Sequence, residues 1–156
     1  MNKTIVRKGE EKDLPALMQL IKELAEYEQC AGEVETGIAE LRSWGFGPDK
    51  VFGFFVAEKE GTVVGIALYY YKYSTWKGRC LFLEDLIITE SERRNGYGSL
   101  LFEAVLELAR QQKVKRLEWQ VLAWNEPALN FYRKYQAVVD NEWLNCRITD
   151  KQLQGL

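Results

Sequence analysis

Two arginines and two glycines stand together directly after an apolar run of the chain. The residues Arg93-Arg94-Asn95-Gly96-Tyr97-Gly98-Ser99, here called the glycine loop, follow the apolar stretch Leu81–Ile88 and open a helical pattern. A helix N-terminus leaves backbone N–H groups unpaired and carries about half a positive charge. Glycines let a phosphate oxygen approach the backbone, and arginines add charge-assisted contacts. The glycine loop therefore predicts a phosphate or pyrophosphate ligand, although a plain turn with solvated arginines fits the same spacing.

A pair of carboxylates interrupts the apolar stretch. Glu84 and Asp85 are adjacent, and adjacent residues of a strand point to opposite faces. At least one of them then meets a face where a carboxylate is costly unless it is paired or hydrated. Breaks of this kind in a local pattern concentrate at functional sites, but a salt bridge to Lys72 or Lys77 is the structural alternative.

The chain contains no histidine, which restricts its chemistry. Ser-His-Asp and Cys-His catalysis and histidine-ligated metals are excluded, and we expect no metal. Any proton transfer must use Glu, Asp, Tyr, Lys, Cys or water. The tyrosines and Trp76 around Tyr70 can also form an aromatic wall that attracts a cation, although strand aromatics are more often core.

Length and composition predict one globular domain over residues 1–156. The formal net charge of −2 indicates no general attraction to nucleic acid. No apolar run is long enough for a membrane span, and the N-terminal residues lack an apolar signal core. Three cysteines at unrelated spacings favour reduced thiols in a cytoplasmic protein.

Hydrophobic periodicity predicts alternating strands and helices. The expected strands cover residues 4–8, 51–59, 62–73, 81–88, 116–122 and 137–148. The expected helices cover residues 14–28, 36–44, 99–113, 126–135 and 150–156, with Asp13 and Asn125 as N-caps. This order predicts an α/β (α+β) layer fold.

The segment Arg93–Gly98 resembles the acetyl-CoA loop of the GNAT acetyltransferase superfamily, Gln/Arg-x-x-Gly-x-Gly/Ala. Together with Leu20–Glu28, Ala67–Tyr70, Leu83–Asp85 and Ala123–Tyr132, it is similar to the spermidine/spermine (diamine) acetyltransferase family, which includes thialysine acetyltransferases. The resemblance extends along nearly the whole chain. It implies a single GNAT domain with a mixed sheet of six to seven strands flanked by about four helices.

The resemblance also implies roles for individual residues. Acetyl-CoA is expected to contact Leu86, Ile88, Arg93, Arg94, Asn95, Gly96, Tyr97, Gly98, Ser99, Asn125 and Tyr132. An amine substrate is expected at Tyr27, Glu28, Glu84 and Asp85. Glu84 would take a proton from the ammonium through water, the backbone N–H near Leu86 would polarise the thioester carbonyl, and Tyr132 would protonate the departing thiolate. From the residues alone, Tyr132 is more often a half-buried helix aromatic with a hydrogen-bonded hydroxyl, and Asn125 has a sufficient structural role as an N-cap.

The expected substrate is a primary amine of a small cation, a polyamine, a diamine or a thialysine-like molecule. A protein or aminoglycoside acceptor and a non-catalytic coenzyme-binding module are the alternatives, and the sequence does not name the amine. The family implies a homodimer. Gln136 stands where the family often has glycine, so a positive φ there would be strained.

Overall fold

The computed structural model describes residues 3–156, which divide into two compact units, residues 3–120 and residues 121–156. The expectation of one domain stays a prediction.

The first unit is built on a five-stranded sheet in the order β1-β2-β3-β4-β5. Its strands are β1 (Thr4–Lys8), β2 (Gly53–Lys59), β3 (Thr62–Ser74), β4 (Gly78–Ile88) and β5 (Leu117–Trp119). Neighbours are antiparallel except β4 and β5, which are parallel. Strand β4 is longer than the strand predicted over residues 81–88, and β5 is shorter than the strand predicted over residues 116–122.

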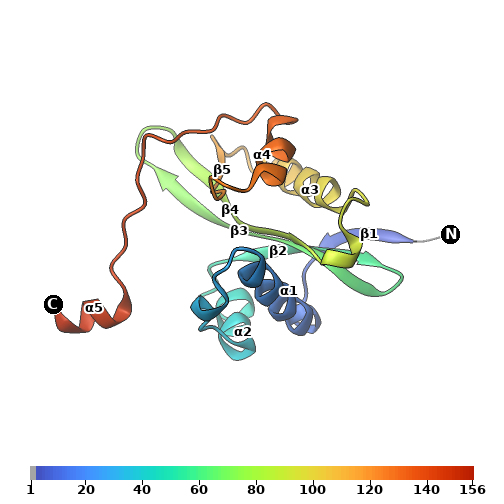
Figure 1. The fold of residues 1–156 in the computed structure, drawn as a ribbon, viewed down its shortest axis with the longest axis horizontal. Coiled ribbons are helices and arrows are strands. Elements are labelled where there is room, and N and C mark those ends of the chain that lie inside the picture. Colours follow the sequence, from blue (N-terminus) through green and yellow to red (C-terminus); the bar gives the residue numbers. More distant parts are fainter. Residues whose placement is uncertain (1–2) are drawn as a thin grey trace. The chain divides into compact units, whose positions relative to one another are not determined.

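Helices cover both faces of this sheet. They are α1 (Leu14–Tyr27), α2 (Ile38–Phe46) and α3 (Tyr97–Gln111), with short 3-10 turns η1 (Glu11–Asp13), η2 (Ala31–Glu33) and η3 (Glu90–Glu92). Within the first unit, α1 and α2 lie on one face and α3 lies on the other (Figure 1). Strand side chains alternate between the two faces, so Phe54 and Val56 of β2 join Leu17 of α1 in one core. The α/β layer prediction is confirmed.

Gly65 allows β3, β4 and α3 to pack closely. A Cβ at Gly65 would lie 2.5 Å from Ile88 Cδ1 and 2.9 Å from the Ile87 carbonyl oxygen. Glycine at this strand position therefore serves a close approach between neighbouring elements.

The second unit contains α4 (Glu126–Arg133) and α5 (Asp150–Gly155). The predicted strand over 137–148 is wrong, because residues 137–149 contain neither helix nor strand. Apolar composition favours a strand, but a strand forms only where a neighbouring strand takes up its N–H and C=O groups. In the described residues the sheet therefore has five strands rather than six to seven.

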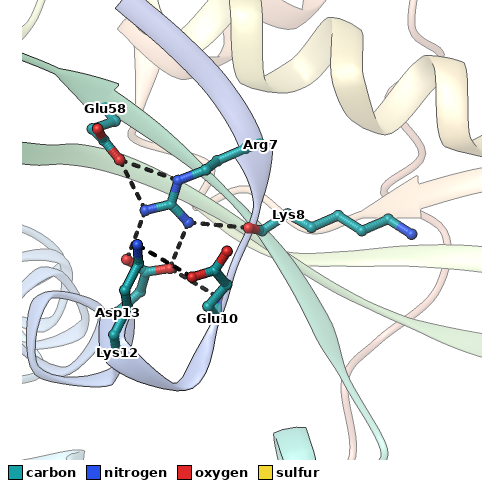
Figure 2. A network of polar contacts seen from close by, with 6 residues as sticks. All are labelled: Arg7, Lys8, Glu10, Lys12, Asp13 and Glu58. Carbon is teal, nitrogen blue, oxygen red and sulfur yellow. Dashed lines mark hydrogen bonds and ion pairs between the residues drawn. The ribbon is translucent and has the colours of Figure 1, made fainter. Parts of the chain in front are cut away.

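A partly buried network of two ion pairs joins β1, η1 and β2. Figure 2 shows the Arg7 guanidinium between Asp13 and Glu58, with Nη1 2.8 Å from Asp13 Oδ2 and Nη2 2.9 Å from Glu58 Oε2. Asp13 stands at the N-cap position of α1, but its side chain makes no cap bond to that helix. It accepts instead from the Glu10 backbone N–H at 2.8 Å. Burial acts to raise the pKa of Asp13, but the bonds from Arg7 and Glu10 outweigh it and lower that pKa.

Candidate active site

The glycine loop forms the turn into α3, as predicted. Gly96 is the N-cap and has a φ of +84°, in the left-handed region that glycine tolerates best. No side chain caps this end, and the backbone N–H of Leu100 is the group that donates to the Gly96 carbonyl. A Cβ at Gly96 would meet no atom within 4 Å, so the space beside it is open. The backbone N–H groups of the first turn are thus arranged to receive an anion.

The two arginines of the glycine loop have different surroundings. Arg93 Nε donates to the Ile88 carbonyl at 3.1 Å, and its guanidinium lies 5.1 Å from the centre of the Tyr27 ring. Arg94 is exposed and has a φ of +66°. Arg93 therefore connects the glycine loop to the end of α1, while Arg94 extends into solvent.

The remaining side chains of the glycine loop differ in availability. Asn95 Nδ2 donates to Glu92 at 3.2 Å, and Glu92 pairs with Lys59 at 2.9 Å. Tyr97 is buried, which leaves its backbone N–H as its means of contacting a ligand, whereas Ser99 is exposed.

The edge of β4 opens beyond Leu83. In the described part of the first unit, β5 accompanies β4 only over Leu81–Leu83. Thr89 N–H donates to the Val64 carbonyl on β3, and N–H directions alternate along a strand. The N–H groups of Leu86 and Ile88 therefore point away from β3, toward the open edge. The Ile88 carbonyl also points away from β3, because it accepts a hydrogen bond from the Arg93 side chain.

A β-bulge brings the two carboxylates to one face. Asp85 pairs with Leu68 and Leu83 pairs with Tyr69, so Glu84 is the extra residue of β4. Asp85 lies opposite Leu68, which belongs to the core beneath α1. Glu84 Oε2 accepts from the Tyr70 hydroxyl at 2.9 Å, and Tyr70 lies two residues from Leu68 on the same face of β3. The expectation that Glu84 and Asp85 point to opposite faces is wrong, because the bulge cancels the alternation.

Asp85 has the most perturbed carboxyl group of the site. Burial is the main cause, followed by the like charges of Glu84 and Glu28, and together they raise the pKa of Asp85 to about 7. Burial also raises the pKa of Glu28. Burial and the bond to Glu84 raise the pKa of Tyr70 to about 12. Lys72, one of the two alternative partners of Glu84, pairs with Glu118 at 3.3 Å.

Sequence reasoning did not find two contacts that position these groups. Tyr70, expected only as part of an aromatic wall, bonds Glu84 directly. Thr89 Oγ1 donates to both carboxylate oxygens of Glu23 at 3.1 Å and so ties the end of β4 to α1. The partners are 14 and 66 residues apart in sequence, and no local pattern signals such pairs.

Asn125 and Tyr132 belong to the second unit. The Asn125 side chain accepts from the Ala128 backbone N–H at 3.3 Å, which confirms its role as N-cap of α4. The half-buried Tyr132 ring lies 5.3 Å from that of Phe131. Gln136 has a φ of +58°, so the left-handed conformation considered for this position is present.

The described residues show neither a metal cluster nor a spanning helix. Within residues 3–156, no three His, Cys, Asp or Glu side chains are arranged to hold a metal ion. None of the helices in that range has the length and apolarity to cross a bilayer.

Comparison with known proteins places these features in a family. The acetyltransferase (GNAT) family model matches residues 15–137. A thialysine N-ε-acetyltransferase from Mus musculus is 34% identical over an alignment that covers 100% of this chain and 98% of the mouse protein. The spermidine/spermine N(1)-acetyltransferase-like protein 1 from Homo sapiens is 31% identical over 81% of this chain and 19% of the human protein.

A solved structure shares the fold. The crystal structure of an aminoglycoside acetyltransferase from an uncultured soil metagenomic sample superposes with a TM-score of 0.77 at 20% identity, covering 94% of this chain and 95% of the other. The resemblance drawn from the sequence motifs is confirmed by these comparisons.

Proposed function

Because the chain belongs to the acetyltransferase (GNAT) family, it is an acyltransferase that moves an acetyl group to an amine, and we propose that the acceptor is a primary amine of a small cation of the thialysine, diamine or polyamine class. The donor used by the family is acetyl-CoA. The observation that supports a cationic acceptor is the group of carboxylates Glu28, Glu84 and Asp85, in which Asp85 feels the charge of both neighbours. Like charges that raise one another's pKa attract an ammonium ion.

The coenzyme is proposed to bind where the glycine loop meets the open edge of β4. Its diphosphate would accept from the amides of Gly96–Ser99, with Arg94 free to add a charged contact. Its pantetheine arm would pair with the N–H and C=O groups of Leu86 and Ile88, which β5 does not reach. Arg93, whose guanidinium faces the Tyr27 ring, would hold the end of α1 against this edge. Asn125 is proposed as a further coenzyme contact.

Acetyl transfer is proposed to occur by direct attack. An ammonium ion has no lone pair, so a carboxylate must first remove a proton, and the family resemblance gives this task to Glu84 acting through water. The free amine then attacks the thioester carbonyl, which the Leu86 N–H polarises. Tyr132 protonates the departing thiolate. The route needs no covalent enzyme intermediate and no metal.

A thiol-release assay tests this function. Purified protein is mixed with acetyl-CoA and, separately, with thialysine, lysine, spermidine, short diamines and aminoglycosides. We expect release of CoA with one of the small linear amines. Release that is fastest with an aminoglycoside, or absent with every amine, would contradict the proposal; the aminoglycoside alternative has support from the shared fold alone.

Two further properties are proposed for the whole chain. Exposed aromatic side chains at the β3–β4 turn, Tyr73 and Trp76, are 74% and 84% accessible and suit a contact between two copies, so we expect a homodimer by sedimentation velocity. Cys30, Cys80 and Cys146 are free thiols, which fits a reducing cytoplasm.

A further inference from the structure

The carboxylate that receives the substrate's proton is not settled by sequence resemblance, because the bulge puts two candidates on one face. Glu84 is exposed, and its Oε2 already accepts a hydrogen bond from Tyr70. Glu84 is therefore a hydrated carboxylate that is already engaged by the Tyr70 hydroxyl.

Asp85 has the opposite environment. It is partly buried between β3 and the end of α1, opposite the core residue Leu68. No hydrogen-bond donor in residues 3–156 reaches its carboxylate. The charged and titratable groups that face it are Glu28 at the C-cap of α1, Glu84 from its own strand, and Tyr70 from β3. The charge of Asp85 in turn helps to raise the pKa of Tyr70. Nothing around Asp85 in this part of the chain stabilises its negative charge. A proton bound to the carboxylate, or a cation beside it, would relieve this.

We propose that Asp85 is the group that accepts the proton of the substrate ammonium, while Glu28 and Glu84 set its basicity and attract the cation. This inference rests on the proposed function and assigns one of its steps. It changes the role of Glu84 from the final proton acceptor to a neighbour that holds the Tyr70 hydroxyl and water.

The proton transfer comes first. An N–H bond of the ammonium breaks, an O–H bond forms on Asp85, and the amine keeps the electron pair. That pair forms the C–N bond to the acetyl carbon as the C–S bond breaks, and the thiolate takes a proton from the general acid. The second proton of the acylated nitrogen returns to that acid, and the proton on Asp85 passes to solvent. The net products are the amide, CoA and one proton.

The environment of Asp85 makes this transfer more favourable. The equilibrium fraction of free amine is inversely proportional to the acidity constant of the acceptor, so it increases as the pKa of the acceptor increases. With a pKa of about 7 in place of 3.8, Asp85 increases that fraction by about 1000-fold compared with an ordinary aspartate. An acceptor near neutrality also releases its proton to solvent before the next turnover.

The test is the pH dependence of kcat/KM for the best amine of the panel. In the wild type we expect an acidic limb near pH 7, followed by a plateau up to the pKa of the amine, which is about 10. In Asp85→Asn the rate must follow the free amine in solution. The limb should therefore move up to about pH 10, with a loss of about 100-fold or more at pH 7.

The neighbours provide a second readout that survives even if Asp85→Asn folds poorly. Glu28→Gln removes a like charge, so the limb should move below its wild-type position. Glu26→Gln is the matched control, since Glu26 is an exposed glutamate of α1, two residues before Glu28, that does not act on Asp85, and the limb of this variant should not move.

The results distinguish Asp85 from Glu84 as the proton acceptor. A limb that stays in place in Asp85→Asn and disappears in Glu84→Gln would overturn the inference and leave Glu84 as the acceptor. An unmoved limb in Glu28→Gln would overturn it too. A wild type without turnover would contradict the proposed function itself.

Discussion

At the scale of single residues, Asp85 links function to a cost in stability. Its pKa rises from 3.8 to about 7 on folding, so between these values the folded state holds a proton that the unfolded state has lost. Stability therefore falls as the pH rises through this window, and the full cost is present above pH 7. Active-site groups commonly reduce stability in this way.

We predict that Asp85→Asn is more stable than the wild type at pH 8. The neutral amide removes the buried charge, and the gain should be about 1–2 kcal/mol after allowance for the partial exposure of the site. In thermal melts this corresponds to a rise of about 2–4 °C per kcal/mol. At pH 4 the gain should shrink. An equal or lower melting temperature at pH 8 would show that Asp85 is not destabilised by its surroundings.

Removal of the Tyr132 hydroxyl is expected to lower kcat strongly. We predict that Tyr132→Phe lowers kcat at saturating amine by about 100-fold or more, because the thiolate then leaves without an acid. Initial rates of thiol release measure this. Tyr135→Phe, which removes a hydroxyl three residues further along the chain, is the control and should keep its kcat. An unchanged kcat in Tyr132→Phe would exclude Tyr132 as the acid.

At the scale of elements, the Arg7–Asp13–Glu58 network holds β1, η1 and β2 together. Asp13 is 4% exposed, and its bonds to Arg7 and to the Glu10 N–H lower its pKa below the ordinary 3.8. A carboxylate of lowered pKa contributes stability above its unfolded pKa and loses that contribution as the pH falls.

We predict that Asp13→Asn costs about 3 kcal/mol at pH 7, because it leaves the Arg7 charge without its main partner. The difference from the wild type should decrease as the pH falls below about 4. Urea unfolding at pH 7 and pH 3 measures both. Glu58→Gln should cost less, since Arg7 keeps Asp13. If Asp13→Asn unfolded at pH 7 with the same urea midpoint as the wild type, this account would be contradicted.

The end of α4 carries a local strain. Gln136 has a φ of +58° while its N–H donates to the Arg133 carbonyl at 3.0 Å. A left-handed conformation costs a residue with a Cβ roughly 1 kcal/mol, and glycine avoids that cost. We predict that Gln136→Gly stabilises the protein by about 0.5–1 kcal/mol in urea unfolding. Gln136→Ala keeps the strain and should give no gain; equal midpoints for both variants would rule out strain as the cause.

At the scale of the whole molecule, coenzyme binding should appear as an increase in thermal stability. A ligand at about 100 times its Kd stabilises the folded state by about 2.7 kcal/mol. We predict that acetyl-CoA at that level raises the melting temperature by about 5–10 °C. Differential scanning fluorimetry measures the shift.

The glycine loop provides the matched variants for this measurement. Gly96→Val places a branched side chain at a φ of +84°, so the rise with acetyl-CoA should be lost. Gly32→Ala, at an open position where a Cβ meets no atom within 4 Å, should keep it. A full rise in Gly96→Val would mean that the coenzyme does not bind at this turn.

Local patterns determined much of this protein. The glycine loop, the N-cap at Asn125 and most of the strands and helices follow from residues close together in sequence, because backbone conformation, capping and periodicity are local. The motif spacing also identified the acetyltransferase family correctly.

The tertiary structure decided the rest, because long-range pairing determines it. The register of β3 against β4 made Glu84 a bulge residue and turned both carboxylates to one face. The approach of α1 brought Glu28 to Asp85 and Tyr27 to Arg93. Apolar residues over 137–148 did not become a strand, since a strand needs a partner that no local pattern supplies. Which side chains a charge meets, and so how basic it becomes, depends on packing between segments far apart in the sequence.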